Sequence, residues 1–208
     1  MTASRAPTDL REITVGQVMS TDPLVLRDDM RVDVAAAMLA NHGYAGAPVV
    51  DQRGRLSGVL HALDVALAHL PPQAAQARSV VVRSLLRPPV TVEPTSPIHV
   101  AAERMRSERT DRLVVVERHI RIVGLVTGQD LLRTVTLHGD LLRRTVDGRI
   151  AALGVTGVVA DVGPGGEIFL SGTVDSITIR DRLVRTVGAI AGVTEIEELI
   201  RIAPSPPT

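Results

Sequence analysis

The alternation of hydrophobic and polar residues predicts the same succession of elements twice within the first two thirds of the chain. A proline-led extended segment comes first, followed by an Ala-rich helix, two short strands joined by a turn, and a closing helix. The order of each copy is therefore β-α-β-β-α. The apolar positions at helical spacing in the Ala-rich helices are Val32, Ala35, Ala36 and Leu39, and then Ile98, Ala101, Ala102 and Met105. The other elements are predicted at 48–50, 56–60 and 63–70, and again at 113–116, 122–126 and 130–137.

The two copies align without a gap. Gly58 matches Gly124 and Asp64 matches Asp130, and the numbers of each pair differ by 66. A constant offset over about fifty residues indicates a duplication. Because one copy alone would leave a face of its sheet uncovered, we expect the two copies to pack together.

Two stretches carry a resemblance to a known family: the hairpin PVVDQRGRLSG at 48–58 and the stretch GLVTGQD at 124–130. They resemble the CBS domain family, whose tandem copies form a Bateman module, here from about residue 13 to 135. The resemblance implies an α/β (α+β) fold in which two β-α-β-β-α repeats pack as a pair. It also implies a homodimer, no required cofactor, and an adenosine ligand such as AMP, ADP, ATP or S-adenosylmethionine.

The residues at 127–130 support two interpretations. Thr127 followed by Asp130, just before an apolar run, is close to a capping box that stabilises a helix. The same helix N-terminus offers free N–H groups that suit a phosphate, and a carboxylate there can accept hydrogen bonds from a ribose diol. By resemblance, Thr127 and Asp130 are the main ligand candidates. Arg112 and Arg133 are candidates for phosphate charge, or are ordinary surface arginines.

The first copy departs from this pattern. Asp64 is kept, but His61 stands where the family has Ser or Thr. Imidazole is a poor helix cap, and it pairs with phosphate only when it is protonated. We therefore expect one occupied cleft per chain, in the half that belongs to the second copy. The second copy has its own departures, because Val114 replaces the hairpin proline and Ile120 replaces the turn glycine.

The last third does not match the repeat. It predicts a helix at 138–152, strands at 155–162 and 168–174, a helix capped by Asp175 or Ser176, and a strand at 195–202. The run at 163–167 is expected to be a hairpin turn, and Gly172 to mark a bulge or a close backbone approach. LSGTV at 170–174 and IAGVTEI at 190–196 make this α-β-β-α-β stretch similar to the BON domain family. That resemblance implies a phospholipid or protein partner.

Composition narrows the function. The chain has no Cys, only Tyr44 and Phe169 as aromatic residues, and a net charge of +0 in which every cation is an arginine. These features argue against thiolate chemistry and nucleic-acid binding. The six scattered His residues lack metal-binding spacing, and no catalytic motif is visible, so we expect neither a metal site nor an enzyme.

These observations predict a regulatory, bacterial-type protein that senses an adenine nucleotide. It is expected to be cytoplasmic, or peripheral at the membrane, because no leader or spanning segment is visible. The alternative is a ligand-independent dimeric scaffold attached to envelope phospholipid through the BON domain. The predicted limits are a tail at 1–12, repeats at 13–70 and 79–137, a linker at 71–78, a BON domain at 138–203 and a tail at 204–208.

Overall fold

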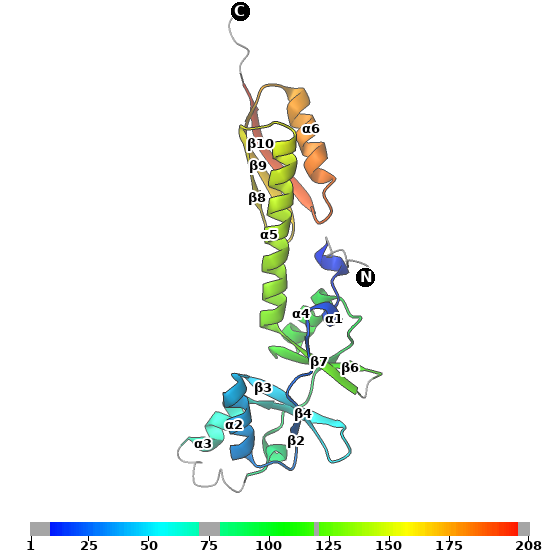
Figure 1. Cartoon of the computed structure of the whole chain (residues 1–208), viewed down its shortest axis with the longest axis vertical. Helices are drawn as coiled ribbons and strands as arrows, with labels where there is room; N and C mark the ends of the chain where they lie inside the picture. Colours follow the sequence, from blue (N-terminus) through cyan, green and yellow to red (C-terminus); the bar gives the residue numbers. More distant parts are fainter. Residues whose placement is uncertain (1–8, 71–79, 119–120, 204–208) are drawn as a thin grey trace, which may run out of the picture. The chain divides into compact units, whose positions relative to one another are not determined.

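The computed structural model describes residues 9–70, 80–118 and 121–203 (Figure 1). The chain divides into two compact units, Thr14–Gly128 and Gln129–Thr208 with Met1–Ile13. The predicted linker at 71–78, the predicted tail at 204–208 and Ile120 lie outside the described residues. None of the helices in the described ranges has both the length and the hydropathy needed to span a membrane.

The first repeat is built from helices packed on a small sheet. Its elements are α1 (Val15–Val18), β1 (Ser20–Thr21), β2 (Leu26–Arg27), α2 (Val32–His42), β3 (Gly46–Val50), β4 (Leu56–His61) and α3 (Ala62–His69). Strand β3 lies between β2, which is parallel to it, and β4, which is antiparallel. Leu26, Leu39, Val49 and Leu60 are buried where α2 and α3 cover this sheet. The apolar residues that were predicted at helical spacing in α2 therefore lie in or against this core.

The second repeat reproduces this arrangement. After η4 (Val82–Leu85) come β5 (Thr91–Val92), α4 (Ile98–Ser107), β6 (Arg112–Glu117) and β7 (Arg121–Thr127). Both hairpins even carry their irregularity at the same place, between Val49 and Val50 in β3 and between Val115 and Val116 in β6. The predicted duplication is thus present in the hydrogen-bonding register as well as in the sequence.

The repeats exchange their leading segments. Strand β1 of the first repeat pairs antiparallel with β7 of the second, with Ser20 opposite Leu125. In return, Arg87 pairs antiparallel with Val59 on β4. Val59, Val114 and Val116 then form a small core to which both repeats contribute. The two repeats pack as a pair, which confirms the predicted α/β (α+β) fold.

One prediction for the closing helices was wrong. The expected separate helices at 130–137 and 138–152 are a single helix, α5 (Gly128–Ala152). His138, Leu142, Val146 and Ile150 are buried at intervals of four residues, so one apolar stripe continues along the helix. Gly139 lowers helix stability by only about 1 kcal/mol and does not end the helix.

The remaining elements form a three-stranded sheet with helices packed on it. They are β8 (Val158–Val162), β9 (Glu167–Val174), α6 (Ile177–Gly188) and β10 (Glu195–Ile202). Strand β9 is central, antiparallel to β8 and parallel to β10. Helices α5 and α6 lie beside the sheet (Figure 1). Residues of α5, α6 and the sheet share one core around Val146, Leu170 and Leu183. The α-β-β-α-β order predicted for this stretch is the one observed.

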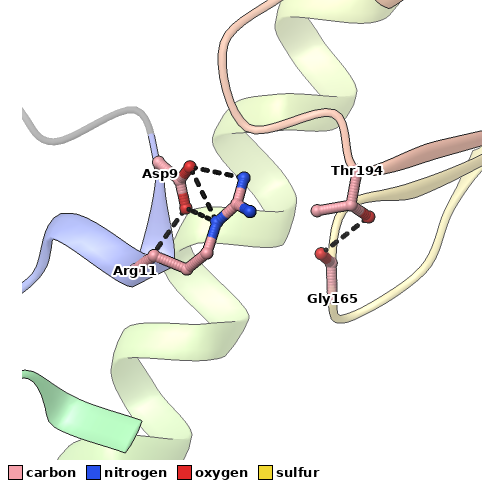
Figure 2. A network of polar contacts seen from close by, with 4 residues as sticks. All are labelled: Asp9, Arg11, Gly165 and Thr194. Atoms are coloured by element: carbon pink, nitrogen blue, oxygen red, sulfur yellow. Dashed lines mark hydrogen bonds and ion pairs between the residues drawn. The ribbon is translucent and has the colours of Figure 1, made fainter.

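Local contacts agree with the turn chemistry expected from the sequence. The Ser176 hydroxyl accepts a hydrogen bond from the Ile179 N–H at 3.3 Å and caps α6. The run at 163–167 is a hairpin turn, and Figure 2 shows the Thr194 hydroxyl donating to the Gly165 carbonyl beside it. A side chain at Gly172 would collide with the Gly157 carbonyl, so this glycine allows a close backbone approach.

The start of the described chain is fixed locally. Asp9 caps the short helix η1 (Leu10–Glu12) by accepting a hydrogen bond from the Arg11 N–H at 2.8 Å. The same carboxylate pairs with the Arg11 guanidinium, as Figure 2 shows. Part of the predicted N-terminal tail therefore has a defined conformation.

Candidate functional site

The strand-to-helix turn of the second repeat lies where the sequence predicts a ligand site. Strand β7 ends at Thr127 and α5 begins at the next residue, with the Gly128 N–H donating to the Asp111 carbonyl at 2.9 Å. Thr127 and Asp130 are both half-buried, and Asp130 lies in the first turn of α5. Arg133 follows on the same helix and is exposed. A hydroxyl, a carboxylate and a helix N-terminus are therefore close together along the chain, which is the set of groups that a nucleoside phosphate needs.

Arg112 takes a position that the sequence did not predict. Its side chain is only 5% exposed, so it is not an ordinary surface arginine. Nε and Nη2 donate to the two carboxylate oxygens of Asp111 at 2.9 and 2.8 Å. A Cβ atom at Gly46 of the first repeat would lie 2.7 Å from Nη1 of Arg112. The guanidinium therefore lies at the junction between the repeats.

The equivalence of these two positions explains how the guanidinium is accommodated. Gly46 pairs with His61 on β4, and Arg112 pairs with Thr127 on β7. Since the numbers of each equivalent pair differ by 66, Gly46 is the counterpart of Arg112 in the first repeat. The large side chain of one copy thus occupies space left by the missing side chain of the other.

The strand-to-helix turn of the first repeat has different chemistry. His61 is the N-cap of α3, and within the described chain its side chain makes no cap hydrogen bond. Burial lowers the pKa of His61 below 6.5, and the nearby guanidiniums of Arg112 and Arg87 lower it further. The imidazole is therefore mainly neutral at neutral pH and unsuited to pairing with a phosphate.

Asp64 of this turn is already paired. Nε and Nη2 of Arg87 donate to Oδ2 and Oδ1 of Asp64, each at 2.7 Å. The Asp64 side chain is 18% exposed and that of Arg87 is 53% exposed. These hydrogen bonds hold the pKa of the Asp64 carboxyl below its ordinary value. Both oxygens that would receive a ribose diol thus already accept hydrogen bonds from a guanidinium.

A groove of about 570 Å³ lies beside this ion pair. Its polar residues are Asp64, Ser84 and Arg87, and its apolar residues are Leu67, Ala68, Val80, Leu85 and Leu86. The sequence does not single out Arg87, because the approach of Arg87 to Asp64 depends on the exchange of leading segments. The signal that could have found it is its place just before the proline-led segment of the second copy, where the first copy has no basic residue.

Two further hollows lie between α5 and α6. The first, of about 350 Å³, is lined by Arg149, Arg182, Arg185 and Thr186 together with Ala189 and Ile190. The second, of about 340 Å³, shares Arg149, Ala189 and Ile190 with the first and is otherwise largely apolar. None of the described residues that line the two hollows is acidic. The surface is therefore suited to an anion that carries an apolar part.

No metal centre is found within the described ranges, where no group of three or more His, Asp and Glu side chains converges.

Comparison with known families identifies the duplicated unit. The model of the CBS domain matches twice, at residues 15–70 and 82–136. A CBS domain-containing protein of Dictyostelium discoideum is 32% identical over 130 residues, which cover 58% of this chain and 90% of that protein. The L-aspartate semialdehyde sulfurtransferase of Methanocaldococcus jannaschii is 27% identical over 119 residues, but the match covers only 22% of its length. The similarity to that enzyme thus concerns a part of it.

Solved structures give the same result. The structure of CBSX2 in complex with AMP has a TM-score of 0.52 and 26% identity, covering 60% of this chain and 96% of that one. The CBS domain pair of protein MJ0100, in complex with 5′-methylthioadenosine and S-adenosyl-L-methionine, has a TM-score of 0.51 and 25% identity. That match covers 59% of this chain and 98% of the other. Two family matches and a duplicated fold together show that this chain belongs to the CBS domain family and carries two CBS domains in tandem.

Proposed function

We propose that this protein is a regulatory sensor of adenine nucleotides that binds one nucleotide per chain at the turn 127–130. The observation that carries the proposal is the second-repeat turn, where Thr127 ends β7 and Asp130 lies in the first turn of α5. The similarity to CBSX2, which was solved with AMP, supports the choice of ligand class.

The chemistry of this turn fits a nucleotide. The first N–H groups of α5 and the Thr127 hydroxyl would bind a phosphate, and the Asp130 carboxylate would accept hydrogen bonds from the ribose hydroxyls. Arg133 would add positive charge near the phosphate. Since the only aromatic residues are Tyr44 and Phe169, outside this turn, the purine would be held between Val and Leu side chains. We therefore expect modest affinity.

Regulation would follow from a shift in population. The two repeats exchange leading segments and share a core, so a ligand that binds one arrangement of the repeats more tightly would favour that arrangement. We further propose that the chain acts as a homodimer in the cytoplasm, and that the last third is a BON domain which presents a partner-binding surface.

Calorimetric titration of the full chain with AMP, ADP, ATP and S-adenosylmethionine tests the sensor. We expect one site per chain. Asp130→Asn keeps the size of the side chain but removes its charge, and should weaken binding at least about tenfold, the effect of losing hydrogen bonds to a charged group. Asp147→Asn on an exposed part of the same helix is the matched control. Equal binding by wild type and Asp130→Asn would contradict the assigned site.

The arginine-lined hollow favours a second function for the last third, the binding of anionic phospholipid. Arg149, Arg182 and Arg185 would contact a phosphate headgroup, while the neighbouring apolar hollow would take the start of an acyl chain. This activity, without nucleotide binding, is also what a membrane-attached scaffold would require.

Co-sedimentation with vesicles of anionic or of neutral phospholipid tests this function. Wild type should pellet with the anionic vesicles, and Arg182→Gln/Arg185→Gln should pellet much less. Arg104→Gln, in α4 of the other unit, should behave as wild type. Failure of wild type to pellet with anionic vesicles would contradict lipid binding.

A further inference from the structure

The groove beside Asp64 has the size of a ligand site but contains an internal ion pair. Its volume of about 570 Å³ lies within the range of small-molecule pockets, about 300–1,000 Å³. Size is therefore not the obstacle to a nucleoside in the first repeat. The obstacle is chemical, because both oxygens of the Asp64 carboxylate accept hydrogen bonds from Arg87.

The backbone holds Arg87 in place for this contact. Its N–H and C=O exchange hydrogen bonds with Val59 on β4, both at 3.0 Å. Gly58 makes the approach possible, since a Cβ atom there would lie 2.8 Å from the Arg87 carbonyl oxygen. Asp64 lies in the first turn of α3, directly after β4, so the guanidinium spans from one element to the next.

The second repeat provides an internal comparison. Ser20 pairs with Leu125 as Arg87 pairs with Val59, and its carbonyl oxygen would lie 2.9 Å from a Cβ atom at Gly124. Val59 and Leu125 are equivalent residues of the two repeats, because their numbers differ by 66. Ser20 and Arg87, which pair with them, are therefore structural counterparts. The duplicated scaffold thus carries a cation at this position in one copy and a short neutral side chain in the other.

We propose that Arg87 is a built-in ligand of Asp64 that keeps nucleosides out of the groove of the first repeat. The guanidinium–carboxylate pair is bidentate and carries charge on both partners, whereas the ribose hydroxyls are neutral donors to the same carboxylate. A nucleoside would have to compete with the guanidinium for Asp64. Arg87 thereby restricts occupancy to the second repeat. This inference rests on the proposed nucleotide-sensing function and names the residue that sets its stoichiometry.

Titration of AMP into full-length variants that carry Asp130→Asn reduces the contribution of the second repeat, so that binding by the first repeat can be detected. Arg87→Ser installs the serine that stands at the equivalent position beside the second repeat, and we expect Arg87→Ser/Asp130→Asn to bind AMP up to about fivefold more tightly than Asp130→Asn alone, the effect of removing a partly exposed ion pair. Arg55→Ser/Asp130→Asn is the matched control. Arg55 pairs with Asp51 at 2.7 Å with similar exposure but does not line the groove, so its removal should leave AMP binding unchanged.

Arg87→Lys/Asp130→Asn is a second test that keeps the charge but removes the planar guanidinium. Its AMP affinity should lie between those of Asp130→Asn and Arg87→Ser/Asp130→Asn. Equal AMP affinity with and without Arg87, in variants whose thermal midpoints match, would overturn the inference. So would two sites per chain in wild type. If Asp130→Asn alone binds AMP as tightly as wild type, the proposed function fails as assigned. The effect of Arg87 is still measured by comparing Asp130→Asn with Arg87→Ser/Asp130→Asn. No AMP binding by any of these proteins would overturn both.

Discussion

The two CBS repeats have nearly the same backbone and different chemistry at the same turn. Each has a hairpin with a register shift at the equivalent residue, an adjoining segment from the other repeat, and a helix that starts directly after the second strand. In the second repeat this turn carries Thr127. In the first it carries His61, whose side chain is partly buried beside two guanidiniums.

The differences between the repeats are concentrated around that turn. Gly46 faces His61 where Arg112 faces Thr127, and Arg87 stands where the other copy has Ser20. Residues that build the hairpins, by contrast, remain similar in both copies. The two copies thus keep the same packing while the residues around the equivalent turns differ, with an ion pair between Arg87 and Asp64 at the turn of the first repeat.

The largest effect on stability is expected from replacing Gly46, which leaves space for the Arg112 side chain. A Cβ atom at Gly46 would lie 2.6 Å from the Leu60 carbonyl oxygen and 2.7 Å from the Arg112 guanidinium. Gly46→Val should therefore lower the free energy of unfolding by about 3 kcal/mol, the upper part of the range for overpacking. Urea denaturation measures the loss.

A double-mutant cycle tests whether the two residues are coupled. In an Arg112→Ala background the guanidinium is absent, so Gly46→Val should cost less than in wild type, although the Leu60 carbonyl still opposes it. Strict additivity of the two changes would show that the two positions are not packed against each other as described.

A smaller effect is expected from Arg112 itself. Arg112→Met fills similar space but removes the hydrogen bonds to Asp111, and should lower the free energy of unfolding by about 1–2 kcal/mol. The carboxylate it leaves is 66% exposed and remains hydrated, so the loss is smaller than for a fully buried pair.

Arg55→Met is the control for this variant, because the Arg55–Asp51 pair is mostly exposed and contributes about 0.2–1 kcal/mol. Removal of Arg112 should also raise the pKa of His61, since the guanidinium is one of the causes that lower it. An unchanged His61 titration by NMR would contradict the placement of Arg112 at the junction.

The sequence was informative wherever a feature depends on local pattern. The offset of 66 residues predicted the hairpins, the helices between them and the packing of two copies, and local turn chemistry predicted the cap at Ser176 and the turn at 163–167. The division of α5 was predicted wrongly, because the end of a repeat does not have to be the end of a helix. The buried stripe from His138 to Ile150 continues past it.

The internal partners at the first cleft could not be predicted in the same way. Arg87 reaches Asp64 only because the segment that leads into the second repeat pairs with β4 of the first. Arg112 is buried only because its counterpart in the other copy is a glycine. Both contacts join residues far apart in the chain, and a chain with so many arginines gives no local sign of which ones are buried. The roles of Thr127, Asp130 and Arg133 in ligand binding remain predictions.

The smallest effect, and the finest test of the comparison, concerns pH. The pKa of His61 in the folded protein is below 6.5, so the unfolded chain binds a proton on this residue more readily than the folded protein does. The stability contributed by neutral His61 is therefore complete above about pH 6.5 and is lost as the pH falls through the folded-state pKa.

His61→Thr, which installs the residue found at 127, should remove this part of the acid sensitivity. It should also add a small stabilisation at every pH, because threonine can cap α3 where histidine does not. The thermal midpoint should then fall less steeply between pH 8 and pH 5 in the variant than in wild type. The pKa of His138 is lowered by burial too, but this residue is present in both proteins and cancels in the difference. Parallel pH profiles for wild type and His61→Thr would show that His61 is solvated like an ordinary histidine. The contrast between the two turns would then rest on Arg87 and on the difference between Gly46 and Arg112.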